Sequence, residues 1–102
     1  EANRAGFSAV GCRVEATTTA AYMPDAQDAT VKLIAERGSG RLLGAQAIGG
    51  QGSAKRVDVI ATALVGRLTV DDLLGLDLGY APPFSSLWDP LQLAARQILP
   101  QL

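Results

Sequence analysis

The sequence predicts a single α+β domain, spanning residues 1–102, in which an antiparallel sheet packs against helices. Two observations on patterning predict this class. The first half of the chain carries three strand-like apolar runs, and from Lys55 onward the apolar residues recur at helical spacing instead. A third observation is length: 102 residues can bury a real core as one domain, and no repeat or linker divides them.

The first strand is expected between Val10 and Thr19, where apolar and polar residues alternate. Its inward face would carry Cys12, Val14 and Ala16. Before it, residues 1–9 have the composition of a helix end, since Ala and Arg favour helices and Gly6 favours a stop. We therefore expect a short helical remnant followed by a half-buried strand.

A hairpin is expected next. Ala29–Arg37 alternates in the same way, Gly38-Ser39-Gly40 is a turn signal, and Arg41–Ile48 is a second apolar run. The run at 41–48 is apolar on both faces, a pattern typical of a strand in the centre of a sheet. Gly49-Gly50 ends it.

Three helices are expected after the hairpin. The first begins near Lys55, ends near Gly66 and presents an apolar stripe that we assign to the core: Val57, Ile60, Ala61, Leu64, Val65 and Leu68. Thr69 would cap a short second helix, Val70–Leu76, with two aspartates in its first turn. The adjacent prolines keep Asp77–Ser85 extended. Ser86 would cap a last helix with this apolar stripe: Leu87, Trp88, Leu91, Ala94, Ala95 and Ile98.

Composition excludes several kinds of function. Nine basic and ten acidic residues leave a net charge of −1, which argues against binding nucleic acid or an anionic membrane. No apolar run reaches the roughly 20 residues of a membrane helix. The absence of histidine removes the commonest general base and metal ligand, so we expect no metal site. We expect a cytoplasmic protein, and the abrupt start at Glu1 suggests a piece of a longer chain.

Several motifs then occur together in one order. They are Gly40–Gly50, Lys55–Val59, Leu68–Leu73, Asp77–Ser85 with its Tyr-Ala-Pro-Pro-Phe-Ser sequence, and Trp88-Asp89-Pro90. Together they resemble the C-terminal dimerisation domain of the pyridine nucleotide-disulfide oxidoreductases. The branch with coenzyme A-disulfide reductases, NADH oxidases and NADH peroxidases is the most similar. The resemblance runs from about Val14 to Ala95.

The resemblance implies a much longer parent enzyme, a homodimer that uses FAD and NAD(P)H. The parent's FAD domain would hold the redox cysteine, and this domain alone would bind neither cofactor and be inactive. In agreement, the chain has no Gly-x-Gly-x-x-Gly fingerprint. The missing histidine also selects the branch, because the glutathione reductase branch takes a catalytic histidine from this domain.

The resemblance also implies site residues. Tyr80 opens the Tyr-Ala-Pro-Pro motif and would reach into the partner subunit's active site, where its phenol can bond or protonate a thiolate. Tyr22 matches a second family tyrosine that precedes a proline, with Met23 between it and Pro24 here. Either tyrosine could instead simply pack in its loop. Pro82, Pro83, Phe84 and Trp88 are the expected interface residues.

For Cys12, Lys55 and Arg56 we expect structural roles. Cys12 lacks a second cysteine or a histidine nearby and should be a small buried hydrophobe. Lys55 and Arg56 could contact a phosphate or coenzyme A, but a surface pair, or ion pairs with Asp58 or Asp89, are preferred. Alternatives for the parent are an NADH oxidase or peroxidase. The alternative of another class is a free-standing, non-enzymatic interaction module, which the upstream reading frame would distinguish.

Overall fold

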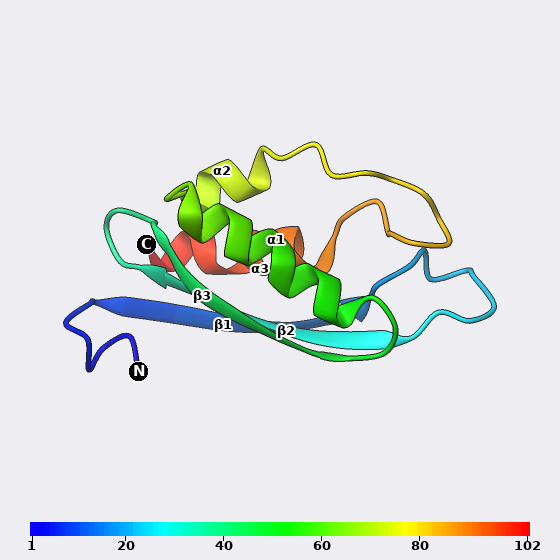
Figure 1. Ribbon diagram of the computed structural model, residues 1–102, viewed down its shortest axis with the longest axis horizontal. Helices are drawn as coiled ribbons and strands as arrows, with labels where there is room; N and C mark the ends of the chain where they lie inside the picture. The colour runs from blue at the N-terminus through cyan, green and yellow to red at the C-terminus, as the bar shows by residue number, and fades with distance from the viewer.

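The computed structural model describes all of residues 1–102, as a three-stranded antiparallel sheet with helices packed on one face (Figure 1). The strands are β1 (Ala9–Thr17), β2 (Asp28–Glu36) and β3 (Leu42–Gly49), in the order β1-β2-β3. The helices are α1 (Ser53–Val65), α2 (Val70–Leu74) and α3 (Pro90–Ile98), and a 3-10 turn, Leu99–Gln101, follows. The predicted α+β class and element order are confirmed.

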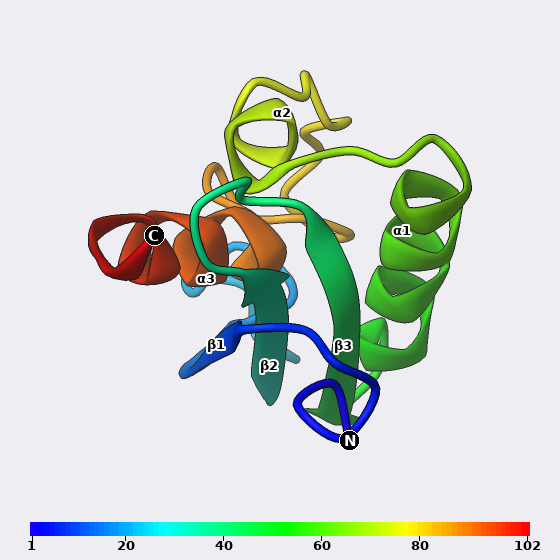
Figure 2. The ribbon, with the colours of Figure 1, turned by 90° about the vertical axis from the view of Figure 1, so that its left-hand side faces the viewer.

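The core lies between the sheet and α3. Along β2, the predicted alternation places Val31, Leu33 and Ala35 in the core with no exposed surface. Cys12 pairs with Leu33 across the β1–β2 ladder, so the inward faces of the two strands coincide. Figure 2 shows α1 beside β3 and α3 over β1 and β2.

The position of β3 corrects a prediction. The two-sided apolar pattern predicted a central strand, but β2 is central and β3 lies at the edge. One face of β3 contacts α1, while Ile48 on the strand is 74% exposed. Much of the apolar character of β3 comes from small residues, Gly44, Ala45 and Ala47. Such residues fit an exposed or a buried face equally well, so their pattern does not report burial.

The first residues also differ from expectation. Residues 2–6 form turns and not a helix end, with Ala5 N donating to Glu1 O at 3.1 Å. Gly6 ends the turn at φ +97°, a conformation that glycine adopts without strain. One helical turn without packing is too short to be stable, so the chain passes directly into β1.

Helix α1 buries a different face from the one predicted. Its buried residues are Ser53, Arg56, Ile60 and Ala63. Of the predicted stripe, only Ile60 is fully buried, and Val65 is 87% exposed. The helix is therefore rotated relative to its apolar stripe, because its buried face includes the charged side chain of Arg56. The predicted end at Gly66 is confirmed.

The two later helices begin at side-chain caps. Thr69 and Asp72 form a capping box at the start of α2, as the sequence predicted in part. The cap of α3 is Asp89 and not Ser86, since Asp89 accepts a bond from Leu91 N and Pro90 occupies the first turn. Leu87 and Trp88 therefore lie before the helix and are 73% and 47% exposed. No helix is both long and apolar enough to cross a membrane.

Candidate functional site

The two loops that carry the predicted site residues meet at one end of the sheet. The first loop, residues 18–27, joins β1 to β2, and the second, residues 77–88, lies between α2 and α3 (Figure 1). Ala20 N donates to Pro82 O at 3.0 Å and connects them directly. Sequence positions far apart are thereby brought to a single surface.

Tyr22 and Tyr80 are neighbours on this surface. Their side chains are 75% and 54% exposed. The pKa of Tyr22 is raised above its ordinary value of 10.0, firstly because nearby atoms displace some of its solvent. The phenol of Tyr80 raises the same pKa further, through its negative charge when ionised and through hydrogen bonding to the Tyr22 phenol. The structure therefore places the two predicted residues within interaction range.

Arg56 contacts the backbone of both loops. Its Nη2 donates to Thr18 O at 2.8 Å in the first loop and makes a longer contact, 3.5 Å, to Phe84 O in the second. Its Nη1 donates to Gly52 O at 3.0 Å, at the start of α1. The rigid guanidinium fork thus connects three separate segments of backbone.

The charge of Arg56 is balanced by Asp89. The carboxylate accepts from Nε of Arg56 at 3.2 Å and lies 3.1 Å from Nη2. The other carboxylate oxygen accepts from Leu91 N at 3.0 Å. Both residues are 8% exposed, so this is a buried ion pair that also begins α3.

The preferred interpretation of Lys55 and Arg56 is confirmed in its ion-pair form. Lys55 pairs with Asp58 at 3.4 Å on the exposed side of α1, and Arg56 pairs with Asp89. The idea of a surface pair is wrong for Arg56, which is buried. Because most of its N–H groups are bonded within the chain, Arg56 has little capacity left to bind a phosphate.

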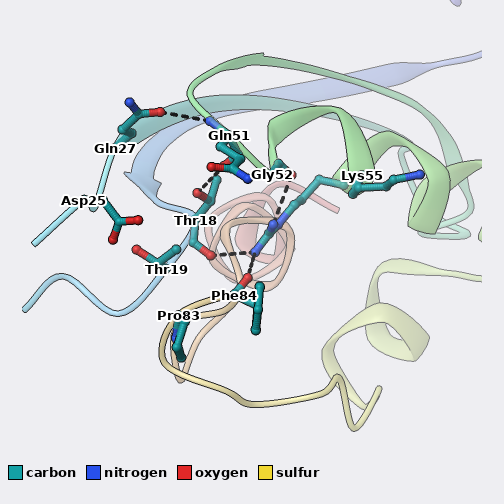
Figure 3. Close-up of a pocket in the computed structure, with 10 residues that line it drawn as sticks. Thr18, Thr19, Asp25, Gln27, Gln51, Gly52, Lys55, Pro83 and Phe84 are labelled. Carbon is teal, nitrogen blue, oxygen red and sulfur yellow. Dashed lines mark hydrogen bonds between the residues drawn. The ribbon is translucent and has the colours of Figure 1, made fainter. Parts of the chain in front are cut away.

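Two hollows flank Phe84. The first, with a volume of about 520 Å³, is lined mainly by polar groups from both loops and from the start of α1, including Thr19, Asp25 and Lys55 (Figure 3). The second, of about 400 Å³, is lined by Tyr80 and Val59 among others. Phe84, Lys55 and Arg56 line both. The site is therefore an open, divided surface and not an enclosed cavity.

The predicted interface residues form an exposed apolar margin beside the tyrosines. Phe84 is 77% exposed, Pro83 is exposed and Pro82 is half-buried. The Arg96 guanidinium lies 5.2 Å from the centre of the Trp88 ring, within cation–π range. Large apolar groups displayed together in this way are typical of interaction surfaces. Contact with a partner stays a prediction for each of them.

Cys12 lies apart from this surface, as the sequence predicted. It is 8% exposed, on the inward face of β1, and its thiol donates to Ala94 O at 3.1 Å. Burial raises the pKa of the thiol, although a hydrogen bond from the Leu33 backbone partly opposes this. A buried, protonated thiol is a poor nucleophile, so Cys12 is structural.

The glycines at 49–52 do not form a dinucleotide cradle. A side chain on Gly50 would overlap Gln27, and one on Gly49 would come within 2.5 Å of Asp28 O. The Gln51 amide is already bonded to Gln27 Oε1 at 3.0 Å. These glycines allow close packing against the chain itself, and they follow an antiparallel edge strand. These glycines therefore do not fit the phosphate-binding turn of an FAD or NAD(P)H site.

Two features of the site escaped sequence reasoning. The cap at Asp89 was missed, although Asp followed by Pro is a recognisable helix start. The buried role of Arg56 was missed because its spacing from Ile60 and Ala63 was hidden by the stronger apolar stripe beside it. That stripe leaves Val57 and Val65 exposed on the outer face of α1.

Comparison with known proteins gives a consistent result. The family model described as "Pyridine nucleotide-disulphide oxidoreductase, dimerisation domain" matches residues 1–91. The chain is 35% identical over 96 residues to the NAD(P)H sulfur oxidoreductase (CoA-dependent) of Pyrococcus abyssi, covering 94% of this chain and 21% of the relative. It is 38% identical over 74 residues to the coenzyme A disulfide reductase of Staphylococcus epidermidis, covering 72% of this chain and 17% of the relative.

Solved structures agree with the sequence relatives. The NAD-dependent persulfide reductase from A. fulgidus superposes with a TM-score of 0.90 at 40% identity, covering 98% of this chain and 19% of that one. The CoADR-RHD protein of Bacillus anthracis gives 0.88 at 42% identity, covering 94% and 17%. The chain therefore spans about a fifth of the length of the proteins it matches.

Proposed function

Because this chain belongs to the pyridine nucleotide-disulphide oxidoreductase family, as a dimerisation domain, we propose that it completes the active site of a partner subunit in a disulfide reductase. In this proposal, residues 1–102 are the C-terminal domain of a longer cytoplasmic enzyme that forms a homodimer. FAD and NAD(P)H bind to the other domains in this proposal, and the glycines at 49–52 of this one do not form a dinucleotide-binding turn.

One observation carries the proposal: two exposed tyrosines lie together on loops that are fastened to each other. Exposed phenols attached to a rigid frame suit a surface that enters another protein's site, because their orientation is set before docking. The frame here is the Ala20–Pro82 bond together with the buried Arg56 fork.

The chemistry assigned to Tyr80 is hydrogen bonding and proton donation at sulfur. When a disulfide is reduced, the thiolate of the parent enzyme's redox cysteine attacks one of its sulfurs and forms a new S–S bond, while the original S–S bond breaks and the other sulfur leaves as a thiolate. The Tyr80 hydroxyl can donate a hydrogen bond to that thiolate, or transfer its proton to give the thiol. Tyr22, with its raised pKa, stays protonated beside Tyr80 and remains a hydrogen-bond donor there.

The relatives suggest the class of substrate. One relative is named a coenzyme A disulfide reductase, another a CoA-dependent NAD(P)H sulfur oxidoreductase, and a third a persulfide reductase. All three names concern sulfur, and two of them, disulfide and persulfide, specify a sulfur–sulfur bond. We accordingly assign a small disulfide or persulfide linked to coenzyme A as the substrate of the whole enzyme.

The experiment uses the full-length enzyme that contains this domain. Replacing Tyr80 by Phe should lower the kcat for NAD(P)H-dependent reduction of coenzyme A disulfide by at least about tenfold, as expected for loss of an acid catalyst. Tyr22→Phe should lower it less. Ile48→Ala, a change at another exposed residue, on β3, is the control and should leave the rate unchanged. An unaltered kcat in Tyr80→Phe would remove Tyr80 from the mechanism.

A second candidate function is reduction of oxygen. It is favoured by a relative in Methanocaldococcus jannaschii named NADH oxidase, 33% identical over 90 residues and covering 88% of this chain and 20% of the relative. Assaying the full-length enzyme with oxygen and with coenzyme A disulfide as alternative acceptors separates the two. A kcat/KM that is higher for oxygen would select the oxidase.

A further inference from the structure

The backbone around Tyr80 has very few hydrogen bonds. Between Asp77 and Tyr80 no backbone N–H or C=O takes part in a backbone–backbone hydrogen bond. A side chain on Gly79 would meet nothing within 4 Å, so this part of the loop also lacks close packing. A tyrosine on such a segment needs some other restraint to hold one orientation.

The Ser85 hydroxyl supplies that restraint. Its oxygen accepts from Ala81 N at 2.8 Å, and its proton is donated to Gly79 O at 2.9 Å, with Ala81 O at 3.3 Å as a weaker acceptor. Gly79 O and Ala81 N belong to the two peptide units that meet at the Cα of Tyr80. One hydroxyl therefore bonds the backbone on both sides of Tyr80.

Ser85 is itself held by a tight turn. Phe84 N and Ser85 N both donate to Ala81 O at 2.8 Å. Inside the turn, Pro82 and Pro83 have fixed φ angles, which leaves the turn little freedom to lose. Pro82 O is in turn bonded to the other loop through Ala20 N. The Ser85 hydroxyl thus connects the backbone at Tyr80, which makes no backbone–backbone hydrogen bonds, to a turn that makes several.

We infer that Ser85 is the positioning residue of Tyr80, and that its hydroxyl sets the direction in which the phenol points. Only the expected effect of Ser85 on catalysis rests on the proposed function. The positioning itself is a property of this chain and can be measured in it. Ser85 does not touch the substrate in this account and acts through the backbone alone.

The first test measures amide hydrogen exchange of the 102-residue chain. Ser85→Ala should speed exchange of the Ala81 amide by roughly two- to tenfold, since the Ser85 hydroxyl is its only partner. Ser85→Thr keeps the hydroxyl and should restore protection. Ser86→Ala is the matched control, because its hydroxyl bonds Trp88 O instead. Equal Ala81 exchange in wild type and Ser85→Ala would overturn the inference.

The second test measures the full-length enzyme. Ser85→Ala should lower kcat with little change in KM, Ser85→Thr should recover most of the rate, and Ser85→Ala should add nothing in a Tyr80→Phe background. Equal losses in both backgrounds would show that Ser85 does not act through Tyr80. If instead Tyr80→Phe alone has no effect, the proposed function fails while the exchange test still decides the positioning.

Discussion

The two tyrosines show how much a single side chain depends on its neighbour. Tyr22 is largely exposed, yet its pKa is raised, partly by local loss of solvent and partly by Tyr80. Neither effect is visible from Tyr22 and its sequence neighbours. The sequence identified both residues by resemblance to a family, and only the fold placed them together.

The pairing predicts a coupled titration. Tyr80→Phe should move the pKa of Tyr22 down toward its ordinary 10.0, because the second phenol and its charge are gone. Absorbance of the phenolate across alkaline pH measures this directly, since each single variant leaves one tyrosine to titrate. A Tyr22 that ionises at the same pH with and without Tyr80 would show that the phenols do not interact.

Cys12 predicts a stability effect with a defined pH direction. Cys12→Ala should lower the free energy of unfolding by about 1–2 kcal/mol at neutral pH, through lost packing and the lost bond to Ala94 O. Because the folded-state pKa is raised, the wild-type advantage is full below the ordinary thiol pKa of 9.0 and declines as pH rises beyond it.

Urea unfolding of wild type and Cys12→Ala at a series of pH values measures that advantage. Subtracting the variant removes the tyrosine contribution, which both proteins share. An advantage that grows in alkali would mean that the thiol ionises more readily when folded. Thiol labelling should also be slow in native protein and fast in urea.

At the scale of elements, the orientation of α1 is decided by an ion pair. Its buried face includes Arg56, whose guanidinium contacts Gly52, Thr18 and Asp89. Asp89 also begins α3. Two helices and two loops thus depend on one charged pair, and most of the apolar stripe of α1, Ile60 excepted, is left facing outward.

This dependence predicts a large difference between adjacent residues. Arg56→Met should destabilise the chain by about 3–5 kcal/mol, because it leaves the buried Asp89 carboxylate without its partner. Lys55→Met breaks only an exposed pair and should change stability by less than about 1 kcal/mol. Midpoints of urea unfolding compare the two variants, and equal shifts would contradict a structural role for Arg56.

At the scale of the molecule, most of the exposed large apolar groups lie on the loop surface and on the outer face of α1, and Ile48 on β3 is a further one. Phe84, Leu87 and Val65 are each more than 70% exposed. The family model that matches this chain describes a dimerisation domain, and we expect dimerisation to cover some of these groups.

If Phe84 anchors the dimer interface, truncating its side chain should weaken the dimer. In the full-length enzyme, Phe84→Ala should raise the dimer dissociation constant by at least about tenfold, as expected for an interface anchor. Ile48→Ala is the matched control, since Ile48 is 74% exposed and Phe84 77%. Sedimentation velocity over a range of concentrations measures both constants. If Phe84→Ala dissociates no more readily than Ile48→Ala, Phe84 lies outside the interface.

The sequence by itself determined the α+β class, the order of the elements, the buried faces of β1 and β2, and the capped start of α2. These follow from local spacing and from short-range caps, which a linear pattern records directly. Its motifs also identified the family, because several of them occur in the right order.

Only the tertiary structure decided the edge position of β3, the rotation of α1 and the meeting of the two loops. Each depends on partners distant in sequence. Strand order is set by pairing, the rotation of α1 by the burial of Arg56 against Asp89, and the pairing of tyrosines by Ala20 and Pro82. Periodicity shows which residues are apolar, but the contacts of the folded chain determine which of them are covered.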